Sequence, residues 1–149
     1  MDNFKEIKAN EHSIWCECGV KQNSYQTIKS VRIILNNGFI LDTSKEESLK
    51  EFQSSHKSLA NGLLALREEL MQDSFLLKEI KRKFAIKNTT GYGLNSLCDF
   101  SDLRDILNHI FIGAEGTLGF VSRVEYETCE DYAFKATSLL FYEKFKSSF

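Results

Sequence analysis

The stretch Ile112-Gly113-Ala114-Glu115-Gly116-Thr117-Leu118-Gly119-Phe120-Val121 decides the fold, because a helical pattern stops there and a strand pattern begins. It is the only place in the chain where three glycines fall within seven residues. Gly113 suits the left-handed residue after a helix end, and Gly116 and Gly119 allow a turn that no side chain obstructs. Such a turn suits either a flat ligand with polar edges or a tightly packed neighbouring strand. Glycine spacing alone favours the strand.

Both flanks of this stretch have a clear pattern. Upstream, four apolar residues recur at the i, i+3, i+4 and i+7 spacing of one helix face, and Ser101 or Asp102 is placed to cap the helix. These apolar residues are Leu103, Ile106, Leu107 and Ile110. Downstream, residues 117–128 are rich in β-formers and predict a strand.

Length and composition exclude several classes of protein. The 149 residues suit one domain or a piece of a larger one, and 42% hydrophobic residues allow a substantial core. The net charge of −2 gives no general attraction to nucleic acid or anionic lipid. No apolar run approaches the roughly 20 residues of a transmembrane helix, and the first residues lack a signal-peptide core. We therefore expect no nucleic-acid partner, no transmembrane segment and a cytoplasmic location.

The cysteines and histidines indicate neither disulfides nor a metal site. Four cysteines in such a chain fit reduced thiols. Cys16 and Cys18 form a C-x-C pair, whereas zinc sites typically contain C-x₂-C pairs. The three histidines have no ligand partner three to five residues further on, so each is expected to be an ordinary surface or helix-face residue.

A β-hairpin is the clearest local prediction. Residues 31–35 and 39–42 are β-rich runs, and Asn36-Asn37-Gly38 lies between them as a turn signal. The segment before it, residues 18–25, is expected to be a loop that contains Gly and Asn.

Three helices should follow the hairpin. A short one, capped by Asp42, Thr43 or Ser44, ends near Phe52, and a longer one covers residues 58–71. The apolar face of the longer helix would contain Leu59, Leu63, Leu66 and Leu70, and its water-facing side Arg67, Glu68 and Glu69. The third helix, residues 74–84, would bury Leu77, Ile80 and Phe84. Its basic cluster Lys81-Arg82-Lys83 is most simply a solvated face, with phosphate binding as the alternative.

Two polar features could carry chemistry. Residues 87–95 form a glycine-bearing loop in which lysine, amide and hydroxyl groups could donate hydrogen bonds to an anionic or carbonyl-rich partner. The alternative is a loop that only satisfies its own backbone. Glu115 is the one carboxylate in the glycine-rich turn. We favour a structural role for it, accepting backbone N–H bonds, over work as a general base.

Two motifs together point to a family. Lys87-Asn88-Thr89-Thr90-Gly91-Tyr92-x-Leu94-x-x-Leu97, followed by residues 112–122, resembles the FAD-linked oxidase domain of the vanillyl-alcohol oxidase type. The match is most similar to the D-lactate (D-2-hydroxyacid) dehydrogenases that pass electrons to a quinone or cytochrome. The resemblance extends to Gly19-x-x-Gln22-Asn23-Ser24-Tyr25-x-Thr27, the hairpin and residues 61–67, and covers roughly residues 16–145.

This resemblance implies a fold and a cofactor. The fold would be α+β, a mostly antiparallel sheet flanked by helices, as in the second subdomain of a PCMH-type FAD-binding domain. Residues 16–132 would form that subdomain after a poorly specified lead-in, residues 1–15, and residues 133–149 would begin a substrate or cap domain with a strand over 136–142. The implied FAD-binding residues are Cys18, Gly19, Gln22, Asn23, Tyr25, Lys87, Asn88, Gly91, Gly113, Glu115, Gly116, Thr117, Gly119, Phe120 and Val121.

The chain also departs from the family pattern. No glycine-rich pyrophosphate loop precedes Ser13, no family-type histidine motif follows, and Trp15 stands at or near a position where the family has glycine. The resemblance therefore implies an FAD-binding part of a D-2-hydroxyacid dehydrogenase that is not active alone and contributes no catalytic residue. It would lie in the cytoplasm, with the inner face of the membrane as the alternative. A non-catalytic remnant, a subunit of a split enzyme and an interaction module without flavin are the other readings.

Overall fold

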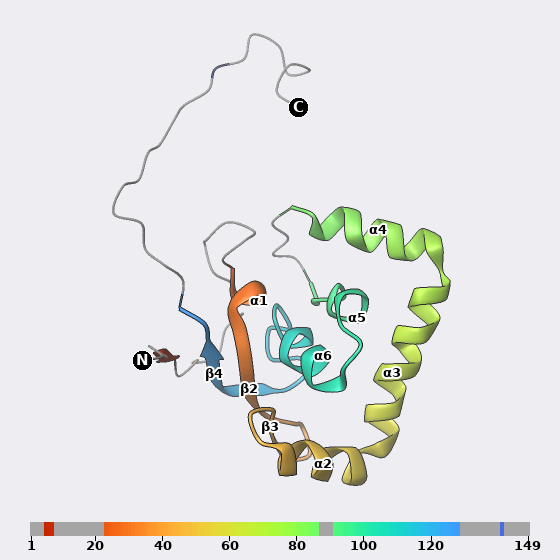
Figure 1. Ribbon diagram of the computed structural model, residues 1–149. Coiled ribbons are helices and arrows are strands. Elements are labelled where there is room, and N and C mark those ends of the chain that lie inside the picture. Colours follow the sequence, from red (N-terminus) through yellow and green to blue (C-terminus); the bar gives the residue numbers. More distant parts are fainter. Residues whose placement is uncertain (1–4, 8–22, 87–90, 129–140, 142–149) are drawn as a thin grey trace.

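The protein has an α+β fold in which helices pack against one face of an antiparallel sheet (Figure 1). The computed structural model describes residues 5–7, 23–86, 91–128 and 141. In chain order the described elements are β1 (Lys5–Ile7), α1 (Ser24–Thr27), β2 (Ile28–Ile34), β3 (Ile40–Asp42), α2 (Glu46–Ser55), α3 (Lys57–Gln72), α4 (Ser74–Phe84), α5 (Ser96–Asp99), α6 (Leu103–Ile110) and β4 (Phe120–Tyr126). Among these residues, no helix combines the length and apolar character that a bilayer crossing requires.

Strand β2 is the centre of the sheet, whose strand order is β1-β4-β2-β3 with antiparallel neighbours throughout. The predicted hairpin is confirmed: β2 and β3 pair with Ile34 opposite Ile40. Its loop closes with Gly38 N–H donating to Leu35 C=O at 2.9 Å, and Gly38 has the left-handed φ of 84° that such a loop requires. The short β1 was not predicted and lies in the segment expected to be a poorly specified lead-in.

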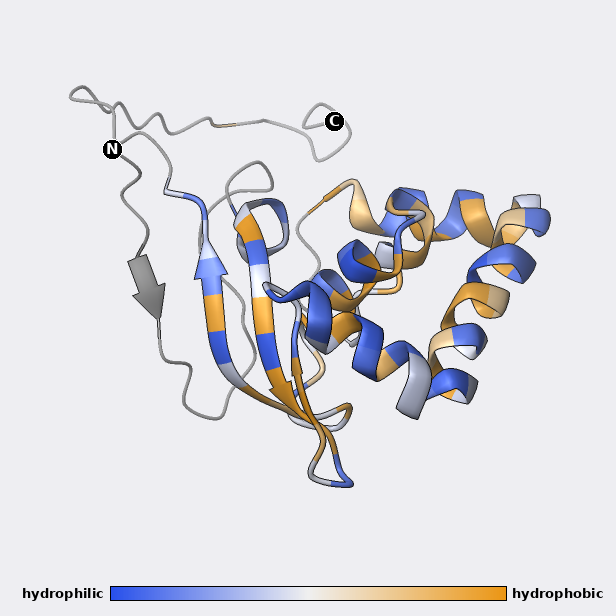
Figure 2. Cartoon of the chain, turned by 60° about the horizontal axis from the view of Figure 1, so that its bottom comes forward, coloured by the Kyte–Doolittle hydropathy of each residue, from blue (hydrophilic) through white to orange (hydrophobic). Residues whose placement is uncertain are grey.

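The hydrophobic core lies between the sheet and the helices (Figure 2). The sheet contributes Ile33 and Leu41, both 0% exposed, and α6, which packs against β2, contributes Ile106, also 0% exposed. The predicted α6 is confirmed, because its apolar stripe is buried and the Asp102 carboxylate caps it by accepting the Arg104 N–H at 2.9 Å. This places the end of α6, and the glycine-rich stretch after it, beside the central strand.

The other predicted helices are present, with one shifted start. α4 has the predicted bounds, and α3 is one residue longer at each end. α2 begins at Glu46 rather than directly after a cap at Asp42, Thr43 or Ser44. Asp42 and Thr43 are engaged elsewhere, since the Arg123 guanidinium donates to the Asp42 carboxylate at 3.2 Å and the Thr43 hydroxyl is bonded to Val31. Tertiary partners therefore remove the predicted caps.

The inward face of α3 agrees with the prediction only in part. Leu70 is buried and Leu63 packs against the core, as expected. Leu59 and Leu66 remain 48% and 47% exposed, while Ala60 on the adjacent side is 3% exposed. Arg67 does not point to water, because its Nε donates to the Phe100 C=O at 2.7 Å. α3 packs on α5 and α6. The side of α3 that faces these two helices is therefore turned relative to the side that the leucine spacing indicated.

Three further predictions concern segments near the chain's ends. Residues 18–25 were expected to be a loop, but α1 begins at Ser24 and the Asn23 side chain caps it by accepting the Gln26 N–H at 3.0 Å. The strand predicted over 117–128 is present as the shorter β4. The strand predicted over 136–142 lies, apart from Phe141, outside the described residues.

The hairpin loop contacts the junction between α2 and α3, which we call the α2–α3 corner. His56 is both the C-cap of α2 and the N-cap of α3. Its ring stacks on Phe52 with the centroids 5.4 Å apart and lies 4.5 Å from the Phe39 ring. In the loop, Asn37 Nδ2 lies 2.7 Å from His56 Nε2. Side chains of the hairpin loop are thus attached to the α2–α3 corner.

The Thr43 hydroxyl supports a testable prediction about the sheet. Thr43 is 1% exposed, and its Oγ1 accepts the Val31 N–H at 2.8 Å and donates to the Val31 C=O at 3.1 Å. We expect Thr43→Val to lower the free energy of unfolding by about 1–3 kcal/mol, because it leaves a buried N–H without an acceptor. Urea denaturation measures the change. Ser54→Ala, which alters an exposed hydroxyl, should shift it by less than about 0.5 kcal/mol, and equal effects of both would contradict the prediction.

Candidate functional site

The glycine-rich stretch forms a tight turn between α6 and β4. Gly113, Glu115 and Gly116 have left-handed φ values of 75°, 50° and 76°. The turn is closed by the Ala114 C=O, which accepts both the Thr117 N–H at 2.9 Å and the Thr117 hydroxyl at 2.5 Å. Two glycines at left-handed positions lower the cost of this backbone, and Glu115 adopts the same conformation without that advantage.

The outer part of the turn presents bare backbone to solvent. Glu115 and Gly116 are exposed, whereas Gly113 and Ala114 are buried. A Cβ added at Gly116 would meet no atom within 4 Å. Within the part of the chain that the structure describes, no acceptor binds the N–H of Glu115 or Gly116, and no donor binds the Glu115 carboxylate. The structural role expected for Glu115 is therefore not found among these residues, and the two N–H groups are open to a ligand.

Gly119 has a different role from Gly116. A Cβ at Gly119 would lie 2.9 Å from Ile33 Cγ2 and 3.1 Å from the Ile34 C=O oxygen. Atoms do not approach so closely, so glycine is needed here for β4 to start against β2. The glycine pattern has two interpretations, strand packing and ligand contact, and these apply to different residues. Gly119 allows the strands to pack closely, whereas Gly116 leaves backbone atoms exposed at the surface.

The two motif loops meet in the structure. The Tyr92 and Thr117 hydroxyls are hydrogen-bonded at 3.1 Å, with Tyr92 as the donor because the single Thr117 proton goes to the Ala114 C=O; this bond joins the glycine-rich turn to the loop that follows Gly91. Gly93 lies against the end of α6, because a Cβ there would be 3.0 Å from the His109 C=O oxygen and 3.4 Å from that of Ile112. Segments that are distant in sequence therefore form one continuous surface.

Exposed apolar side chains are present in the same two loops and at the start of β4. Four of them are about two-fifths exposed or more. They are Tyr92 (45%), Leu94 (43%), Leu118 (39%) and Phe120 (45%). A surface that combines unpaired peptide N–H groups with aromatic and aliphatic side chains suits a flat ring with polar edges. We call the residues 91–94 and 113–120 the glycine-turn surface.

A buried cluster of aromatic rings lies behind this surface, at α6. The His109 ring is stacked on Phe100 with centroids 4.1 Å apart and lies edge-on to Tyr25 at 4.7 Å. The Tyr25 hydroxyl donates to Asp99 at 2.8 Å. Burial, and then the bond to Asp99, raises the pKa of Tyr25 well above its ordinary value. Burial lowers the pKa of His109. His109 thus lies on a buried face of α6, so the helix-face alternative of the prediction holds and the surface alternative is wrong.

Two buried oxygens near the same loop have no hydrogen-bond partner among the described residues. The Asn95 side chain donates through Nδ2 to Asp99, but within that part of the chain its Oδ1 accepts no hydrogen bond and Ser96 Oγ makes none. Asn95 is 8% exposed and Ser96 0%. A buried polar atom without a hydrogen bond lowers the free energy of unfolding. The segment that follows Leu94 is therefore destabilised by two such atoms.

The structure groups only some of the predicted FAD-binding residues. The exposed part of the glycine-turn surface contains Gly91, Glu115, Gly116, Thr117 and Phe120; Gly119 and Val121 are half-buried beside it, and Gly113 is buried under it. Tyr25 is only 7% exposed and packs on His109, whose carbonyl lies against Gly93, so it lies beneath this surface and not on it; Asn23 caps α1. Cys18, Gly19, Gln22, Lys87 and Asn88, like Trp15, fall outside the described residues. Tyr92 joins the surface although it was only part of the motif, and spacing carried no signal of its contact with Thr117.

Replacing Gly119 and replacing Gly62 by alanine should change the free energy of unfolding in opposite directions. Gly119→Ala should lower the free energy of unfolding by about 1–3 kcal/mol, because the added methyl collides with Ile33. Gly62 lies inside α3 with nothing within 4 Å of an added Cβ, so Gly62→Ala should raise it by about 0.5–1 kcal/mol. Thermal and urea unfolding measure both. Shifts of the same sign would show that the close approach of the strands is not the cause.

His109 predicts a pH dependence of stability. Because burial lowers its pKa below 6.5, the folded protein holds the neutral ring while the unfolded chain binds a proton as pH falls below about 6.5. The contribution of the neutral His109 ring to the free energy of unfolding is complete above about pH 6.5. As the pH falls from about 6.5 to the pKa of His109 in the folded protein, the free energy of unfolding decreases by at most about 1.4 kcal/mol per pH unit. His109→Phe, which cannot titrate, should flatten this part of the urea-unfolding profile. Identical pH slopes for the two proteins would contradict the prediction.

Known proteins offer no independent assignment of this surface. No protein-family model matches the chain, and no curated protein and no solved structure is similar to it. The resemblance to FAD-linked oxidases therefore rests on the residues of the two motifs. What the glycine-turn surface does has to be argued from its exposed N–H groups, its apolar side chains and the contact between Tyr92 and Thr117.

Proposed function

We propose that this chain forms an FAD-binding part of a flavin-dependent D-2-hydroxyacid dehydrogenase of the D-lactate dehydrogenase type. The observation that carries the proposal is the meeting of the two motif loops, through Tyr92 and Thr117, around a turn whose backbone is bare. The motifs suggested that both loops contact the same cofactor, and their contact is the arrangement that such a shared ligand requires.

The residues of the turn fit the edge of a flavin. The N–H groups of Glu115 and Gly116 would donate to the carbonyl and nitrogen atoms of the isoalloxazine ring, and the missing side chain at Gly116 leaves the ring room to approach. Leu118, Phe120 and Tyr92 would contact its apolar part. FAD would supply the acceptor for the hydride that leaves C2 of the hydroxy acid. The contribution of these residues is to bind and orient the ring.

The described histidines do not supply a catalytic base. His109 is enclosed by Tyr25 and Phe100, and His56 lies at the α2–α3 corner under Phe39. None of the ring contacts and hydrogen bonds described for these two imidazole rings involves a residue of the glycine-turn surface. This agrees with the proposal of a part that binds the cofactor while the acid and base groups, and the pyrophosphate contacts, come from other segments of the enzyme.

A flavin titration with two matched glycine variants tests this. Backbone amide NMR of the ¹⁵N-labelled chain should show FAD-induced shifts concentrated at Glu115, Gly116 and Leu118. Gly116→Ala should abolish most of them, because the methyl occupies the face offered to the ring. Gly38→Ala is the control, since Gly38 has a similar φ of 84° and equally open surroundings but lies in the hairpin loop. It should cost similar backbone strain and leave the shifts intact.

The outcomes separate the alternatives. Shifts that avoid both loops, or that Gly38→Ala reduces as strongly as Gly116→Ala, would contradict a flavin site at this surface. The absence of any shift at millimolar FAD would favour a non-catalytic remnant that kept the fold and lost the cofactor. Stoichiometric FAD binding together with D-lactate oxidation by this chain alone would contradict the other half of the proposal, that the chain is only part of the enzyme.

A further inference from the structure

Helix α4 has an outward face that the core does not use. Its inner side carries Ile80, 6% exposed, and packs on α3. On the outer side Phe75 is 75% exposed, and Ile86, two residues beyond the helix end, is 71% exposed. Large apolar side chains exposed to this degree lose hydrophobic free energy unless a further surface covers them.

The same helix concentrates positive charge. Four exposed cations lie on it, and its one acidic residue, Glu79, is already paired with Arg82, whose Nε and Nη2 lie 3.1 Å and 3.0 Å from the carboxylate. The cations are Lys78, Lys81, Arg82 and Lys83. The chain as a whole carries a net charge of −2, so α4 is a basic face on an acidic protein. Net charge alone therefore gives the wrong sign for this face.

Two basic side chains lie between two apolar ones along one line of the helix and its continuation. Phe75, Lys78 and Arg82 stand at i, i+3 and i+7, which places them on one side of α4. Ile86 follows four residues after Arg82. The phenyl ring of Phe75 and the cations of Lys78 and Arg82 thus lie on the same side of α4. Leu76, 44% exposed, and Met71, 40% exposed at the end of α3, widen the apolar part.

We propose that this outward face of α4 docks on the surface of an anionic lipid bilayer. Such a surface offers anionic headgroups to the lysines and, a few ångströms deeper, an acyl boundary for Phe75 and Ile86. A nucleic acid would meet the charges but provides no apolar layer for Ile86. The combination of both side-chain types on one line is what favours the bilayer.

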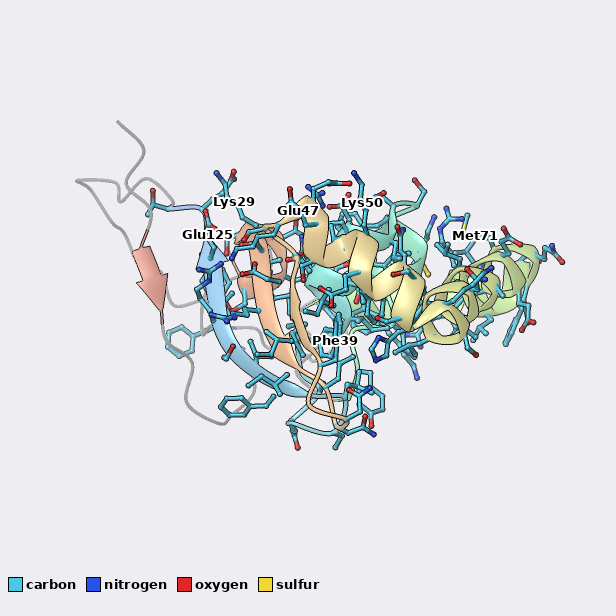
Figure 3. All side chains as sticks on the ribbon, turned by 90° about the horizontal axis from the view of Figure 1, so that it is seen from below. Lys29, Phe39, Glu47, Lys50, Met71 and Glu125 are labelled. Atoms are coloured by element: carbon cyan, nitrogen blue, oxygen red, sulfur yellow. The ribbon has the colours of Figure 1, made fainter. Side chains whose placement is uncertain are left out.

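The position of α4 permits a flat approach. It lies along the outer edge of the molecule, on the far side of α5 and α6 from the sheet (Figure 1). Figure 3 shows Met71, next to α4, at the opposite end of the molecule from Lys29 and Glu125 on the sheet. The sheet would therefore not obstruct contact with a planar surface. This inference does not depend on the flavin proposal.

Vesicle co-sedimentation tests the docking. The full chain should pellet with phosphatidylcholine vesicles that contain phosphatidylglycerol, pellet little with phosphatidylcholine alone, and dissociate at high salt. Lys78→Ala combined with Lys83→Ala should lower the partition coefficient roughly 20-fold, since each basic residue contributes at the surface. Phe75→Ser should lower it about tenfold by removing the inserted ring.

Matched surface variants provide the control. Lys50→Ala combined with Lys57→Ala removes the same charge from exposed positions on α2 and α3, and Figure 3 shows Lys50 well away from Met71. Leu59→Ser removes an apolar side chain that is 48% exposed from α3. These controls should leave partitioning within about twofold of the original chain. No association with anionic vesicles, equal losses in the control variants, or binding to a polynucleotide in place of vesicles would each overturn the proposal. Circular dichroism checks that the helices of every variant are intact.

Discussion

The close approach of β4 to β2 at Gly119 is the constraint on which the rest of the structure depends. β4 enters the sheet beside Ile33 and Ile34 directly after the turn, with no room for a Cβ. The connection from the end of α6 to this contact, residues 111–118, places three residues in left-handed conformations. Glu115 and Gly116 are thereby held outward, and the sheet itself exposes the surface that we assign to the cofactor.

Local sequence signals predicted the parts of the fold that local chemistry determines. The Asn-Gly turn of the hairpin, the Asp102 cap of α6 and the 74–84 bounds of α4 each depend on residues a few positions apart. The orientation of α3 was not predictable in this way. It depends on the bond from Arg67 to the Phe100 carbonyl, and residues 33 positions apart give no periodic signal. The burial of His109 between Tyr25 and Phe100 was missed for the same reason.

The candidate site was predictable only in outline. Glycine spacing located the turn, but it could not separate Gly116, which faces open space, from Gly119, which touches Ile33. That difference depends on the neighbouring strand and is invisible in one sequence. The net charge of the whole chain was equally uninformative, because its value of −2 does not reveal that the exposed face of α4 is basic. In both cases the informative quantity is the surroundings of a residue and not its type.

The corner at His56 has a mechanical consequence for the hairpin. Asn37 and Phe39 at its tip contact the ring that ends α2 and begins α3, and Phe52 behind that ring is 0% exposed. A strand loop that protruded freely would tolerate a lengthened sequence, because only its own closure entropy would change. This loop is instead bound to His56 by side-chain contacts. A peptide tag inserted between β2 and β3 would therefore disturb the junction between α2 and α3. Fusion partners and labels are better placed elsewhere on the molecule.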